Sequence, residues 1–61
     1  MEVNIYMNYK IQVTYGTEGA STHEIVNVTD IQSHDDTFTF YGEDDILFIA
    51  PKSAVVYIKK V

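Results

Sequence analysis

Apolar and polar residues alternate without a break at the start of the chain. Every odd position from Val3 to Tyr15 is apolar or aromatic, and every even position between them is polar except Tyr6. Successive side chains of a β-strand point to opposite faces, whereas a helix would spread the same residues around its circumference. The pattern predicts one strand over residues 3–15.

The length of this predicted strand creates a geometric problem. Thirteen extended residues would span about 43 Å, whereas a compact domain of 61 residues has a radius of gyration of about 10–11 Å. We therefore expect the strand either to bend at a bulge near residues 6–8 or to pair with a second molecule at one end.

A loop with two glycines, residues 16–21, separates this strand from a second one over 22–28. Within the second strand, strict alternation predicts that Val26 and Val28 share one face and that Ile25 lies on the other.

The alternation fails after Val28, because the next apolar residue, Ile31, follows at a spacing of three. A bulge or kink at Thr29 and Asp30 would restore a common inward face for Val28 and Ile31.

Three further strands are predicted, over 37–41, 46–50 and 54–58. The first places Phe38 and Phe40 on one face, which makes them the expected centre of the core. The other two are apolar on both faces, although a strand in a small two-layer protein should have one polar face. A short turn at 51–53, containing the single proline, separates them.

These elements predict one all-β domain over residues 1–61, a five-stranded antiparallel meander with a long, bent first strand. It is expected to form a small SH3-like or Sm-like barrel, or a curled sheet. In outline, the order of a long bent strand, a loop, three short strands, a brief turn and a last strand is similar to SH3-type barrels. The tryptophan pattern that binds peptides in SH3 domains is missing, since the chain has no Trp.

Composition favours an oligomer. A core this small supplies about 3–5 kcal/mol without a staple, and the chain has no cysteine for a disulfide or a thiolate zinc site. The strands that are apolar on both faces also need covering. Both observations predict a homo-oligomer, most simply a dimer.

The charge balance narrows the partners. Four lysines and no arginine stand against nine acidic residues, which gives a net charge of −5. Nucleic-acid binding depends on neutralising phosphates, so we expect a protein partner with a basic surface instead. The sequence has no apolar run long enough to span a membrane and no signal-peptide pattern at its start, and we expect a cytoplasmic protein.

No catalytic or metal-binding motif is present. Ser33, His34 and Asp35 have the residue types of a hydrolytic triad, but immediate neighbours cannot form its chain of hydrogen bonds. His23 and His34 lack the spacing of metal ligands. We therefore expect no enzyme activity, no metal and no cofactor.

Two acidic clusters and two tyrosines are the candidate partner contacts. The clusters flank the strand at 37–41 and should lie roughly 20–23 Å apart. Tyr6 and Tyr41 fall on faces assigned to solvent, and tyrosine is favoured in interfaces because it buries area while keeping a polar tip. The candidate residues are Tyr6, Asp35, Asp36, Tyr41, Glu43, Asp44 and Asp45.

The expected function is that of a non-enzymatic protein-binding module acting as a homo-oligomer. It would inhibit or modulate another, host protein, as small acidic accessory proteins of phages and mobile elements do. The alternative is an oligomeric Sm-like or SH3-like barrel that binds a small ligand or single-stranded nucleic acid at its subunit interface.

Overall fold

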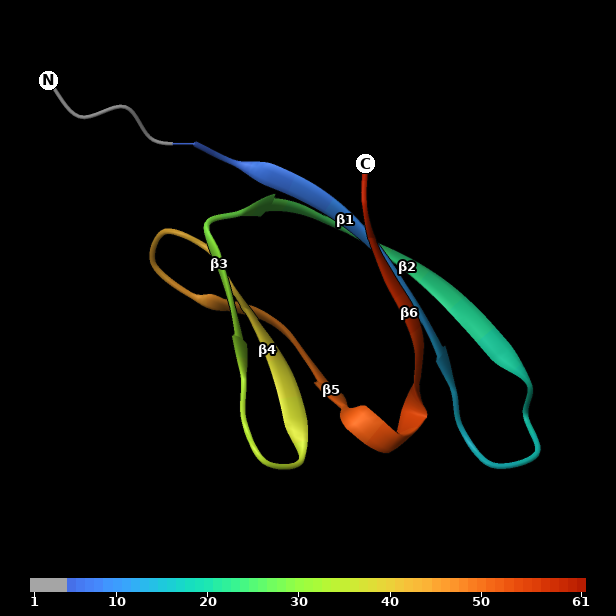
Figure 1. The fold of residues 1–61 in the computed structure, drawn as a ribbon. Coiled ribbons are helices and arrows are strands. Elements are labelled where there is room, and N and C mark those ends of the chain that lie inside the picture. The colour runs from blue at the N-terminus through green and yellow to red at the C-terminus, as the bar shows by residue number, and fades with distance from the viewer. Residues whose placement is uncertain (1–4) are drawn as a thin grey trace, which may run out of the picture.

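The computed structural model describes residues 5–61, and strands dominate this range. The elements are β1 (Met7–Thr14), β2 (Ala20–Val28), β3 (Asp30–Ser33), β4 (Thr37–Tyr41), β5 (Ile46–Pro51), the 3₁₀ turn η1 (Lys52–Ala54) and β6 (Val55–Lys60). They form two three-stranded antiparallel sheets, sheet A in the order β2-β1-β6 and sheet B in the order β3-β4-β5 (Figure 1). The all-β class is confirmed. Within the same range, no helix has the length and apolar character needed to cross a membrane.

The first strand is shorter than its alternating pattern predicts. Ile5 and Tyr6 precede β1, Tyr15 follows it, and the predicted positions Val3 and Asn4 lie outside the described residues. Eight residues span about 26 Å. Within the described residues, the single strand predicted over residues 3–15 is therefore shorter than its alternation indicates.

A bulge lies near the predicted position, but the extra residue belongs to the neighbouring strand. Met7 pairs with Val28 and Tyr9 pairs with Ile25, so β2 advances three residues while β1 advances two. Asn27 takes up the extra residue in a left-handed conformation, with φ of 60°. Ile25 and Val28 are consequently both buried and Val26 is exposed, which corrects the predicted assignment of faces.

The chain turns from sheet A into sheet B at Thr29, as the break in alternation predicts. The Thr29 backbone N–H and its Oγ1 both donate to the Tyr41 carbonyl oxygen, at 2.8 and 3.2 Å. Val28 on one side of the corner is fully buried, and Ile31 on the other side packs against the core. Residues 30–33, beyond the strand predicted over 22–28, form a separate strand, β3, so the chain has six strands instead of five.

The last strand returns to the first one. β6 pairs antiparallel with β1, with Ile58 opposite Ile11, so the predicted meander is wrong at its final step. β6 also begins at Val55, because Ala54 belongs to η1 and is buried there. Among residues 5–61 no strand pair joins sheet A to sheet B, and a closed barrel is not shown.

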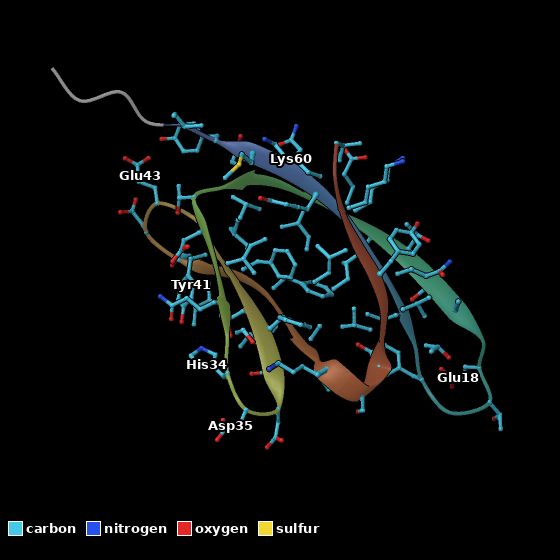
Figure 2. All side chains as sticks on the ribbon, viewed as in Figure 1. Glu18, His34, Asp35, Tyr41, Glu43 and Lys60 are labelled. Carbon is cyan, nitrogen blue, oxygen red and sulfur yellow. The ribbon has the colours of Figure 1, made fainter. Side chains whose placement is uncertain are left out.

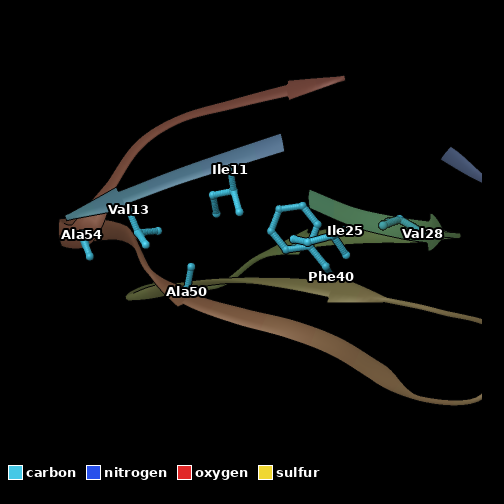
Figure 3. Close-up of a cluster of buried hydrophobic side chains, with 7 residues drawn as sticks. All are labelled: Ile11, Val13, Ile25, Val28, Phe40, Ala50 and Ala54. Atoms are coloured by element: carbon cyan, nitrogen blue, oxygen red, sulfur yellow. The ribbon is translucent and has the colours of Figure 1, made fainter. Parts of the chain in front are cut away.

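The core lies between the two sheets (Figure 3). Phe40 is fully buried, and its ring makes edge contacts with Tyr9 and Phe48 at centroid distances of 6.0 and 6.1 Å. Phe38 was predicted to share the centre but is only half-buried, with Lys52 Nζ 5.2 Å from its ring centroid. The buried apolar residues are Ile11, Val13, Ile25, Val28, Phe40, Ala50 and Ala54.

Candidate functional site

The β4–β5 loop, residues 42–45, is the most acidic turn of the chain. The Gly42 N–H donates to the Asp45 carbonyl oxygen at 2.7 Å, which closes the turn and leaves Glu43 and Asp44 at its exposed tip. A Cβ at Gly42 would lie 3.0 Å from Leu47 Cδ2, so a larger residue here would need the leucine side chain to shift. The loop therefore combines carboxylates with a closely packed leucine.

An open hollow of about 340 Å³ lies beside this loop. Its lining consists of Tyr6, Asn27, loop residues 42–45 and Leu47. The Tyr6 Oη donates a hydrogen bond to Glu43 Oε2 at 2.7 Å, so the segment before β1 is attached to the loop after β4. The hollow thus has an aromatic ring and a leucine together with three carboxylates.

The bulge in β2 supplies the remaining part of the lining. Asn27 sits in the left-handed conformation, and its backbone N–H donates to Asn8 Oδ1 at 3.2 Å. Asparagine adopts this conformation more readily than most residues. The same bulge that buries Ile25 and Val28 therefore turns Asn27 toward the hollow.

Tyr41 lies beside the hollow, on the outer face of sheet B. Residues directly opposite each other in a sheet share a face, and Tyr41 pairs with Asp30 on one side and Ile46 on the other. The next row on this face contains Thr39 and Ile49. The predicted solvent-facing placement of Tyr41 fits this register, although the residue is only half-exposed.

The second acidic cluster is remote from the hollow. Asp35 and Asp36 form the β3–β4 turn, at the opposite end of β4 from Glu43 (Figure 2). The Asp36 carbonyl oxygen accepts a hydrogen bond from the Lys52 N–H at 2.8 Å, which connects this turn to η1.

The structure therefore divides the seven predicted contact residues into three groups. Four of them meet at the hollow, one adjoins it on the outer face of sheet B, and two lie apart. In that order the groups are Tyr6 with Glu43, Asp44 and Asp45; Tyr41; and Asp35 with Asp36.

Sequence reasoning missed two kinds of site residue. Asn27 has a signal in the spacing of three between Ile25 and Val28, which marks an extra residue in the strand. Leu47 belongs to the apolar run at 46–50, which the sequence marks only as a strand that needs covering. Ile46, Leu47 and Ile49 of β5 are all exposed, as are Val56 and Tyr57 of β6.

Charge is unevenly distributed between the sheets. Residues 30–51, which contain sheet B and its turns, hold six of the nine acidic residues and none of the four lysines. Three of the lysines lie in strands of sheet A, at Lys10, Lys59 and Lys60. The molecule consequently has an acidic sheet and a lysine-bearing sheet.

The arrangement is suited to binding a cation attached to an aliphatic chain. Carboxylates accept hydrogen bonds from ammonium or guanidinium groups, and lysine and arginine stems pack on apolar surface while the charged end stays in water. Within residues 5–61, no group of three or more His, Asp or Glu side chains is arranged to hold a metal ion.

No protein-family model, curated protein or solved structure matches this chain significantly.

Proposed function

We propose that this chain is a non-enzymatic protein-binding module that acts as a homo-oligomer and inhibits or modulates a protein with a basic surface. The observation that carries the proposal is the hollow beside loop 42–45. There an aromatic ring, Leu47 and the carboxylates of Glu43, Asp44 and Asp45 lie around one open space.

A lysine or arginine side chain of the partner is the occupant that this hollow fits. Its aliphatic stem would lie against the Tyr6 ring and Leu47, and its charged end would approach the loop carboxylates. The Tyr6–Glu43 hydrogen bond supports this arrangement, because it holds a carboxylate and an aromatic ring next to each other before the partner binds.

We further propose that the two sheets form an SH3-like or Sm-like barrel. Three features support this: the corner at Thr29 that carries one chain through both sheets, the 3₁₀ turn before the last strand, and the return of β6 to β1. An acidic loop at the hollow does not support nucleic-acid binding by such a barrel, because carboxylates repel phosphates.

Capture of a partner from an extract of the native cell tests the binding proposal. We expect the tagged chain to retain one stoichiometric protein. We expect the triple variant Glu43→Gln, Asp44→Asn and Asp45→Asn to retain it at least about tenfold less, since 1.4 kcal/mol of lost interaction has this effect. The substituted side chains are exposed, so stability should change by less than about 0.5 kcal/mol.

The matched control is Glu18→Gln, in the loop between β1 and β2 on a different part of the molecule (Figure 2). It should capture the partner as the unsubstituted chain does. Equal capture by the triple variant would remove the hollow from the binding surface. Capture of nucleic acid alone would favour the alternative function.

A further inference from the structure

The four edge strands of the two sheets differ in how they are protected. An edge strand offers unpaired backbone groups, and charged side chains or bulges normally prevent it from pairing with other chains. β2 has Glu24 and the Asn27 bulge, β3 is only four residues long, and β6 ends in two lysines. β5 alone contains no charged residue, although a bulge near Leu47 and Pro51 interrupt its edge, and its Ile46, Leu47 and Ile49 side chains are exposed.

The open edge of β5 includes the backbone groups of Ile49. In an antiparallel pair, residues that exchange hydrogen bonds alternate with residues that do not. Lys52 lies opposite Asp36, and its N–H donates to the Asp36 carbonyl oxygen, so this pair is hydrogen-bonded. Because the two kinds of pair alternate along the strands, the Thr39–Ile49 pair is not hydrogen-bonded. The Ile49 N–H and C=O therefore point away from β4. Pro51, which has no N–H, falls in the same outward phase.

The open edge of β6 follows from the same reasoning. The Val61 N–H bonds to the Asn8 carbonyl oxygen, and Lys60 and Ile58 pair with Tyr9 and Ile11. Alternation makes both of these pairs non-hydrogen-bonded, so the N–H and C=O groups of Ile58 and Lys60 point away from β1. β6 also exposes 54% of Val56, the same fraction that β5 exposes of Ile49.

We propose that β6 of a second copy adds antiparallel to the open edge of β5. Only the antiparallel direction places the two lysines at the end of β6 beside the acidic loop that precedes β5. With Ile49 opposite Val56 of the second copy, Leu47 falls opposite its Ile58. Beyond the bulge of β5, the same antiparallel direction brings loop 42–45 beside Lys59 and Lys60 of the second copy.

One contact of this kind brings the exposed apolar residues of β5 beside those of β6. Pairing two β5 strands would leave β6 uncovered and would place no strand lysine against the loop. Because the two surfaces differ, the contact is head-to-tail, and it generates a ring if the rotation closes or a chain of copies if it does not. The inference rests on the homo-oligomer part of the proposed function, and its test uses the purified chain and needs no partner.

Charge reversal and mixing test the contact. Sedimentation of the purified full chain at about 10⁻⁴ M should show association. Lys59→Glu with Lys60→Glu, or Asp44→Lys with Asp45→Lys, should weaken it at least about 100-fold, because like charges then face each other. An equal mixture of the two variants should associate again, since each reversed end then meets an opposite charge.

The control variant is Glu18→Lys with Glu24→Lys, which changes the charge equally but lies outside β5, β6 and loop 42–45. It should associate as the unsubstituted chain does. A chain that is monomeric at about 10⁻⁴ M overturns both this contact and the homo-oligomer. Association that survives either reversal, or that the mixture of folded variants fails to restore, overturns the contact alone.

Amide hydrogen exchange of the unsubstituted chain provides a test that needs no variant. The Ile49 and Ile58 amides should exchange at least about tenfold more slowly in concentrated than in dilute solution, because association gives these open-edge groups a partner. Protection that does not depend on concentration at both amides would overturn the proposal.

Discussion

Single residues decide how the sheets of this small protein turn. Asn27 accommodates a left-handed backbone in the middle of a strand, and this one residue changes which side chains of β2 face the core. Its N–H donates to Asn8 Oδ1, so the bulge is held by β1 as well as by its own conformation. The bulge therefore affects the core and the hollow at the same time.

Substitution of Asn27 should separate backbone strain from lost contacts. Asn27→Val should lower the free energy of unfolding by about 1–2 kcal/mol, because a β-branched residue is strained at positive φ. Asn27→Gly should lower it by less, since glycine adopts this conformation freely. Urea denaturation followed by circular dichroism measures both. If valine and glycine have equal effects, the left-handed backbone at Asn27 is not what limits stability.

At the scale of elements, the pattern of the sequence predicted most strands but missed where their ends and bulges lie. The strand at residues 37–41 and the kink at Thr29 follow from local alternation, the strand at 46–50 follows from its apolar run, and all three are confirmed. The later start of β1 could not be predicted in this way, because the alternation continues through Ile5 although the Ile5 side chain is exposed. Ile25 faces the core instead of solvent because β2 contains one extra residue, and simple alternation cannot predict such a bulge.

The candidate site was predictable only in its parts. The sequence identified the acidic turn and Tyr6 as candidate contacts. The contact between Tyr6 and Glu43, however, joins residues that are far apart in the sequence, and no local pattern predicts such a contact. The pairing of β6 with β1 has the same non-local origin. The exposed apolar run of β5 was visible in the sequence as a strand without a polar face.

Substitution of Phe40 tests how the strands pack in the core. Phe40→Ala should cost about 3–5 kcal/mol, which is comparable to the whole stability expected of a core this small. The variant should therefore lose its thermal unfolding transition and its dispersed amide NMR spectrum. Phe38→Ala removes the same atoms from a half-exposed site and should leave a folded protein with a lower melting temperature. A cooperative transition in Phe40→Ala at the original temperature would contradict this account of the core.

At the scale of the whole molecule, charge is divided between the two sheets, whereas exposed apolar residues lie on both. Sheet B and its turns carry most of the acidic residues and the uncharged edge of β5, whereas three of the four lysines lie in sheet A. The proposed contact between copies would bring these opposite charges together. A basic partner and a second copy would then compete for the same acidic loop.

The return of β6 to β1 also has a consequence for the order in which the molecule folds. The pairs β1–β2, β3–β4 and β4–β5 each join strands that are neighbours in the sequence. The β1–β6 pair instead closes a loop that contains nearly the whole chain. Closing a long loop costs more entropy, so β6 should dock last. Ile58→Ala should accordingly accelerate unfolding and leave the folding rate nearly unchanged, as stopped-flow kinetics in denaturant can measure. A slower folding rate would place β6 in the folding nucleus.

Until β6 docks, it can also pair with β1 of another copy, so a slow last step makes strand exchange a competitor of correct closure.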